Sequence, residues 1–287
     1  MNEAVLPFYD THFHAINLHH REPELLTKLS NALKDGSLTQ CIDVGINPGD
    51  QVERLPLLRE LGIAWFTLGV YPSHAADPQL PSVLAELTEQ VHQTLKPADR
   101  LLESATQPHL VAIGEIGIDQ FHDYAPVGLQ QELLRYQIGL ANSYHLPVVI
   151  HNREADQPIL ETIRANPPLA GGILHCFSSS WETAVQLIDF GFRISFAGNL
   201  TYRTAENLRE VAARLDSSHL LCETDSPYLS PVPFRGKTNW PGQVRQVYEC
   251  LAQIRKQPLP ELCHQIATNL GNLLRFKDCQ AARGSPW

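Results

Sequence analysis

The sequence predicts a single (β/α)8 barrel over residues 1–287, and three observations lead to this fold class. The chain has 287 residues, and such barrels typically have roughly 250. Short apolar segments rich in β-branched residues alternate with longer amphipathic segments, which is typical of βα units around a parallel sheet. Several apolar segments end in polar side chains suited to metal binding, and a barrel carries its active site at the carboxyl ends of its strands.

Eight strands are expected in chain order. They are Phe8–His14, Gln40–Gly45, Ile63–Val70, Leu110–Glu115, Leu146–His151, Gly172–Cys176, Phe192–Phe196 and His219–Asp225. Apolar residues recur every three or four positions from Leu80 to Leu95 and from Leu129 to Leu140, which predicts helices packed on the sheet. Pro97–Pro108 is expected to be a long loop. An open doubly wound sheet is the alternative, but no Gly-x-Gly-x-x-Gly joins a first strand to a helix.

Composition and charge exclude several classes of protein. Hydrophobic residues make up 43% of the chain and charged residues 18%. The sequence has no run of about 18 apolar residues, which is the length that a helix needs to cross a membrane. The first residues lack the basic and apolar regions of a signal peptide, so we expect a cytoplasmic protein without a membrane partner. The six cysteines form no Cys-x-x-Cys and are expected to be free thiols. A net charge of −9 argues against a broad electrostatic grip on nucleic acid.

The first strand contributes half of a metal site. In Asp10-Thr11-His12-Phe13-His14, the two histidines are two residues apart in an extended segment. Side chains at this spacing project from the same face of a strand, so His12 and His14 can converge on one cation. Imidazole suits Zn, Fe, Ni or Mn.

Four more strands end in ionisable side chains. They are Glu115 after the fourth strand, His151 after the fifth, His175 after the sixth, and Glu223 and Asp225 after the eighth. Carboxyl ends of parallel strands meet at one rim, where so many histidines and carboxylates need a counter-charge. Divalent cations supply it, so the sequence predicts a metal centre there.

The number of ligands indicates two cations. Four imidazoles and two carboxylates are too many for one tetrahedral site with an open position. We assign one cation to His12, His14 and Asp225, and a second to His151 and His175. Glu115 would bridge the two ions. The identity of the metals stays open among Zn, Mg, Mn and Ni.

The polar segments, in this order and spacing, resemble those of TatD-type metal-dependent deoxyribonucleases, a branch of the amidohydrolase-like barrels. The resemblance spans nearly the whole chain. It rests on the segments Asp10–His14, Gly114–Asp119, Leu146–Ala155, Leu174–Ser178, Gly198–Tyr202, Glu223–Pro227, Phe234–Asn239 and Ala267–Asn269.

The resemblance implies a barrel enzyme that hydrolyses phosphodiester bonds with a divalent metal centre. We expect the substrate to be the ends of DNA, possibly also of RNA, and the protein to be a monomer. The resemblance gives the same six ligands, with Glu115 where many amidohydrolases have a carbamylated lysine. The cations would activate a water molecule. Asp225 would be the general base and Glu223 would orient a neighbouring ligand.

One position departs from the family pattern. Family members commonly have a histidine before a proline after the third strand, thought to meet the substrate phosphate, whereas this chain has Tyr71 before Pro72. Either the Tyr71 hydroxyl or His74 could take its place. Arg153 and Arg235 are further candidates for contacts with backbone phosphates.

Two other functions stay open from the sequence. The protein could hydrolyse a small ester, lactone or amide, because the loops that shape the pocket carry no readable code. A non-catalytic metal-binding barrel is the other alternative, although no predicted ligand is missing from the chain.

Overall fold

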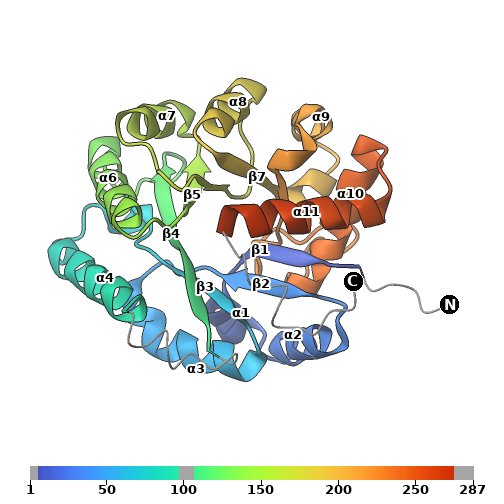
Figure 1. The fold of residues 1–287 in the computed structure, drawn as a ribbon, viewed down its shortest axis with the longest axis horizontal. Coiled ribbons are helices and arrows are strands. Elements are labelled where there is room, and N and C mark those ends of the chain that lie inside the picture. Colours follow the sequence, from blue (N-terminus) through green and yellow to red (C-terminus); the bar gives the residue numbers. More distant parts are fainter. Residues whose placement is uncertain (1–5, 97–106, 275–287) are drawn as a thin grey trace.

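The computed structural model describes residues 6–96 and 107–274, and their strands form an eight-stranded parallel barrel (Figure 1). The sheet order follows the chain from first to last strand. The strands are β1 (Tyr9–Phe13), β2 (Gln40–Asp43), β3 (Trp65–Leu68), β4 (His109–Asp119), β5 (Val148–Arg153), β6 (Gly172–Leu174), β7 (Phe192–Phe196) and β8 (Leu220–Cys222). The predicted loop Pro97–Pro108 falls almost entirely outside the described residues.

The barrel closes between β1 and the segment that follows β8. The backbone N–H of Asp225 donates to the carbonyl of His12 at 2.9 Å, and the N–H of His14 donates to the carbonyl of Ser226 at 2.9 Å. This closure rules out the open doubly wound sheet. Because all strand pairs are parallel, the carboxyl ends of the strands lie at one rim.

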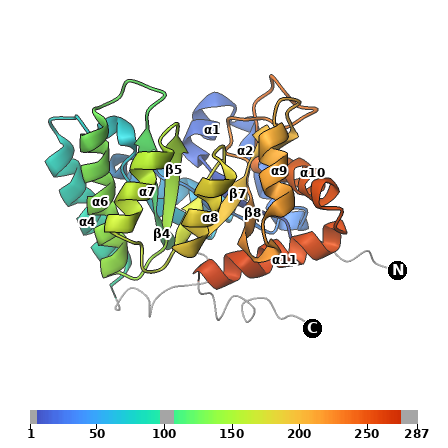
Figure 2. The same cartoon turned by 90° about the horizontal axis from the view of Figure 1, so that it is seen from above.

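Helices surround the strands as an outer layer (Figure 1). They are α1 (Ala15–Arg21), α2 (Glu24–Asp35), α3 (Gln51–Leu61), α4 (Leu80–Thr94), α6 (Val127–Ser143), α7 (Asp156–Ala165), α8 (Trp181–Asp189), α9 (Glu206–Arg214), α10 (Val244–Arg255) and α11 (Leu259–Leu274). Figure 2 shows α11 across one end of the barrel. The Asn269 amide in α11 donates to the carbonyl of Leu220, the first residue of β8, so this is the amino end of the strands. The opposite rim is left open.

The expected end of the fourth strand is wrong. We expected it to end at Glu115, but β4 continues to Asp119 and pairs with β5 as far as Arg153. Gly117 permits this pairing, because its φ is 153° and an added Cβ would lie 1.9 Å from the carbonyl oxygen of His151. Glu115 therefore lies inside the strand, close to β5.

Helix α6 buries only part of its predicted apolar stripe. Leu133 and Leu140 are buried as expected. Leu129 and Tyr136 are exposed, whereas Gln130 and Gln137 are buried. The Gln137 amide pairs with the backbone N–H and carbonyl of Val70 at 2.7 and 2.9 Å. Buried amides that satisfy loop backbone cannot be recognised from apolar periodicity.

Two predictions from composition can be compared with the described residues. The five cysteines among them are free thiols: Cys41, Cys176, Cys222, Cys250 and Cys263. Cys279 lies outside the described residues. Within the same residues, no helix has the length and apolar character needed to cross a membrane.

Candidate metal centre

The six residues predicted as metal ligands come together at the open rim of the barrel. They are His12, His14, Glu115, His151, His175 and Asp225. Four are buried, and the side chains of His151 and Asp225 are each 14% exposed. We call His12, His14 and Asp225 the first ligand group, and His151 and His175 the second ligand group.

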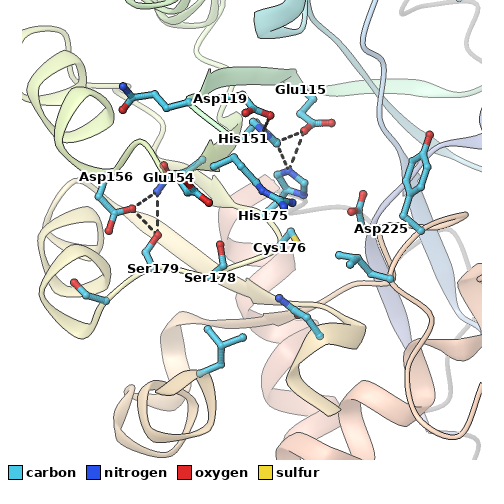
Figure 3. Close-up of a pocket in the computed structure, with 18 of the residues that line it drawn as sticks. Glu115, Asp119, His151, Glu154, Asp156, His175, Cys176, Ser178, Ser179 and Asp225 are labelled. Atoms are coloured by element: carbon cyan, nitrogen blue, oxygen red, sulfur yellow. Dashed lines mark hydrogen bonds and ion pairs between the residues drawn. The ribbon is translucent and has the colours of Figure 1, made fainter. Parts of the chain in front are cut away.

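Glu115 lies between the two groups and turns one carboxylate oxygen to each. Its Oε2 lies 3.4 Å from Nε2 of His12 and 3.6 Å from Nε2 of His14. Its Oε1 lies 2.9 Å from both Nδ1 of His151 and Nε2 of His175, as Figure 3 shows. This is the arrangement expected of a carboxylate that bridges two cations.

The spacing of the first ligand group fits a bound cation. Nε2 of His12 lies 3.3 Å from Nε2 of His14 and 3.7 Å from Oδ1 of Asp225, and His14 lies 3.6 Å from the same oxygen. Ligand atoms around a tetrahedral zinc ion lie roughly 3.4 Å apart, given bonds of about 2.0–2.1 Å. The first ligand group therefore has the dimensions of a metal site.

The histidine tautomers also fit cations. His14 Nδ1 lies 2.9 Å from the carbonyl of Val44 and His175 Nδ1 lies 3.3 Å from Oε1 of Glu223. Because both partners can only accept, the Nδ1 atoms carry protons, and the Nε2 atoms are the ones that can bind a cation or, without one, carry a second proton. Nε2 of His175 faces a Glu115 oxygen at 2.9 Å, so a cation or a proton must lie between the two atoms.

Both carboxylates are ionised, as metal ligands must be. Burial alone would raise the pKa of Glu115, but the charge of His175 and hydrogen bonds from the histidines hold that pKa well below its usual range. Burial likewise opposes ionisation of Asp225, but a hydrogen bond from His14 and the charge of His12 lower its pKa. The pKa of His175 is raised well above its usual value despite burial, mainly by Glu115.

A cavity of about 1680 Å³ opens above these residues and extends over α8 and α9. His14, Glu115, His151, His175 and Asp225 line its floor. A substrate in this cavity would therefore lie against both ligand groups.

Comparison with known proteins agrees with this geometry. The family model of TatD related DNases matches residues 9–275. The chain belongs to the TatD family. It is 31% identical over 269 residues to YabD of Bacillus subtilis, covering 93% of this chain and 99% of that protein. It is 34% identical over 237 residues to YcfH of Escherichia coli K12, covering 82% of this chain and 83% of that protein.

Both of these TatD relatives are named uncharacterized metal-dependent hydrolases. The crystal structure of YjjV, a TatD homolog from E. coli K12, matches this fold with a TM-score of 0.80 and 27% identity, covering 94% of this chain and 98% of that one. The protein is therefore a member of a family of metal-dependent hydrolases.

In this TatD chain the backbone and Asp10 position the first ligand group. The buried Asp10 carboxylate accepts from the N–H of His12 at 3.2 Å and from the N–H and hydroxyl of Thr224 at 2.8 and 2.6 Å. Asp10 therefore ties β1 to the segment that carries Asp225. The sequence motif contains Asp10, but the motif alone predicts no role for it.

Asp119 supports the second ligand group and was also missed. Its Oδ2 lies 3.2 Å from Nε2 of His151, so that nitrogen carries a proton and Nδ1 is left to face Glu115. Asp119 lies four residues after Glu115 in the segment that resembles the family, and an acidic residue near a ligand was the available signal. Glu223, predicted to orient a ligand, lies beside His175 and accepts the N–H of Cys176 at 2.7 Å.

Tyr71 and His74 lie in different environments. The Tyr71 hydroxyl lines the cavity, 3.1 Å from Nε2 of His151 and 3.5 Å from Oδ2 of Asp119. Burial, with the nearby charges of Glu115 and Asp119, raises the pKa of Tyr71, so the hydroxyl keeps its proton. His74 does not line the cavity and lies 3.7 Å from Asp77. Only Tyr71 is placed to meet a molecule in the cavity.

The two arginines also differ. Arg153 lines the cavity, with its guanidinium 4.4 Å from the centre of the Phe121 ring. Arg235 is not a lining residue and lies 3.8 Å over the ring of Tyr202, which does line the cavity. Arg153 is therefore directly accessible to a ligand, whereas Arg235 adjoins the cavity through Tyr202.

Proposed function

We propose that this TatD family member hydrolyses phosphodiester bonds at nucleic-acid ends, as a deoxyribonuclease with two divalent cations. The observation that carries the proposal is the position of Glu115, whose two oxygens face two separate sets of histidines. Paired cations are common in enzymes that cleave phosphate esters, because they clamp both the attacking and the leaving oxygen. The name of the matching family model, TatD related DNase, supports the same substrate class.

Each ligand has a defined task in this proposal. The first ligand group would hold one cation and the second ligand group would hold the other. Glu115 would contribute one oxygen to each. When bound, the cations would supply Lewis-acid polarisation of the phosphate and a more acidic water molecule. The imidazole-rich donor set fits Zn, Mn or Ni, and Mg is the further candidate because phosphoryl transfer often uses it.

Asp225 is the proposed general base. Its side chain lines the cavity, and its lowered pKa leaves the carboxylate ready to accept a proton from the attacking water. The carbonyl of His12 holds the Asp225 backbone at 2.9 Å, so the base is fixed relative to the first ligand group.

The cavity favours a nucleic-acid end over a small molecule. Its volume of about 1680 Å³ exceeds the about 300–1,000 Å³ of typical small-molecule pockets. Arg153 lines it and can contact a backbone phosphate. The net charge of −9 fits local capture of a strand end better than wrapping of a long duplex.

Metal reconstitution tests the proposal. Purified protein would be stripped with a chelator, reloaded with Mg²⁺, Mn²⁺, Ni²⁺ or Zn²⁺, and assayed on single-stranded DNA and RNA, bis(p-nitrophenyl) phosphate and a lactone. We expect metal-dependent cleavage of DNA. Cleavage of the lactone alone would indicate a small-molecule hydrolase, and two bound metals without turnover on any substrate would indicate a non-catalytic barrel.

The Asp225→Asn variant tests the base. We expect DNA cleavage to fall by at least about a hundredfold, because the amide cannot take up the proton. Circular dichroism should show a folded protein, and metal analysis should show partial loading. Asp189→Asn, an exposed residue in α8, is the matched control. Near-complete activity of Asp225→Asn would refute the assignment.

A further inference from the structure

Two exposed tyrosines, Tyr124 and Tyr228, line the mouth of the cavity and have no part in the proposed chemistry. Their exposed fractions are 39% and 45%. Tyr124 lies in the loop between β4 and α6, and Tyr228 lies in the loop after β8. Since the strand order runs from β1 to β8 around the barrel, β4 and β8 are on opposite sides. The two rings therefore flank the metal centre.

Tyr124 is held in place by neighbouring rings. The imidazole of His122 stacks on it, with ring centroids 4.8 Å apart and an interplanar angle of 23°. His122 is itself fixed, because its Nδ1 lies 2.9 Å from Oδ2 of Asp119. Tyr71 meets Tyr124 edge-on at 6.1 Å. Tyr124 is thus oriented beside the second ligand group, since Asp119 and Tyr71 both contact His151.

Tyr228 is held beside the first ligand group. Its backbone N–H donates to the carbonyl of Asp225 at 2.9 Å, so the proposed base and this ring share one turn. Asn17 donates to its hydroxyl at 3.2 Å. The ring meets His14 edge-on at 6.2 Å. Each ligand group therefore has one exposed, positioned aromatic ring next to it.

Both tyrosines line the same cavity, from loops that follow strands on opposite sides of the barrel. A flat molecule that enters the mouth between β4 and β8 would therefore meet aromatic surface on both sides.

We propose that Tyr124 and Tyr228 form a stacking subsite for the unpaired nucleobases on either side of the bond to be cleaved. This inference rests on the proposed nucleic-acid substrate and names the part of it that is recognised. Aromatic rings bind bases of any sequence by stacking, and Arg153 in the same cavity can hold the connecting phosphate. Paired bases are already stacked within a duplex, so the subsite selects single-stranded ends.

Direct binding tests the subsite without turnover. Asp225→Asn protein with Mg²⁺ would be titrated with a short single-stranded DNA that carries 2-aminopurine at its terminal base, at fixed salt. Stacking should quench the fluorescence of 2-aminopurine. Tyr124→Ala or Tyr228→Ala, added to this background, should weaken binding by about tenfold and reduce the quenching. Tyr124→Phe and Tyr228→Phe keep the ring and should bind like the parent.

An abasic DNA distinguishes stacking from a general structural effect. The Asp225→Asn parent should bind an oligonucleotide with abasic terminal residues about tenfold more weakly than the intact one, and the added alanine substitutions should not weaken that binding further. Tyr136→Ala, an equally exposed tyrosine on α6 outside the cavity, should change neither affinity. Equal loss of intact and abasic DNA binding, or no loss, would overturn the subsite.

The outcomes also separate this inference from the proposed function. Cleavage of DNA by the wild type with no base-dependent effect of the alanine variants would refute the subsite alone. Absence of both binding and cleavage of any nucleic acid would refute the proposed function and the subsite with it.

Discussion

The two ligand groups of the metal centre are supported in different ways. The first ligand group is held mainly by backbone. The carbonyl of Val44 accepts a hydrogen bond from Nδ1 of His14, and the carbonyl of His12 accepts one from the backbone N–H of Asp225. The second ligand group is held by side chains, because the carboxylate of Asp119 accepts a hydrogen bond from His151 and that of Glu223 accepts one from His175.

This difference determines which ligand group a single substitution can alter without removing a ligand. Hydrogen bonds to backbone carbonyls persist when a side chain elsewhere is substituted, so the first ligand group should change only when a ligand or Asp10 changes. Carboxylate supports can be altered one at a time while the ligands remain. The second ligand group should therefore be the tunable half of the site.

The largest expected effect comes from Glu115, which both groups share. In Glu115→Gln, one carboxylate oxygen becomes an amide nitrogen without a lone pair, and the bridging charge is lost. We expect DNA cleavage to fall by roughly a thousandfold, with weaker binding of both metals, measured by steady-state kinetics and isothermal titration calorimetry. Glu132→Gln, at an exposed position of α6 outside the cavity, is the control. Loss of only one metal would show that Glu115 does not bridge.

The sharpest test of the comparison is Asp119→Asn. An amide oxygen can still accept the proton of His151, but without the negative charge that makes the imidazole a stronger ligand. We expect the affinity of the second ligand group for metal to fall by about 10- to 100-fold, with the first ligand group unchanged, in a two-step Mn²⁺ titration. Equal weakening of both steps would contradict the independence of the two supports.

Tyr71 should have the smallest effect. Tyr71→Phe removes a hydroxyl that can donate to substrate but leaves Asp119 to hold His151. We expect KM for DNA to rise by about three- to tenfold, as for the loss of one hydrogen bond, with metal affinity almost unchanged. His74→Ala should leave both quantities unchanged, because His74 does not line the cavity. The reverse result would make His74 the substrate contact.

The alternation of apolar segments and the polar residues that follow them were enough to predict the barrel and the identity of the six converging side chains. These features are local, since a strand's parallel neighbours and its carboxyl end follow from βα succession. The spacing of His12 and His14 even predicts their common face.

Tertiary structure decided what those residues contact. Only the pairing of β4 with β5 as far as Asp119 placed Glu115 within 2.9 Å of His151. Roles for Asp10 and Asp119, the inward turn of Gln137 and the separation of Tyr71 from His74 depend on segments far apart in the chain. A local pattern predicts the face that most apolar residues of an element take, whereas the burial and the hydrogen-bond partners of polar residues depend on where distant backbone lies.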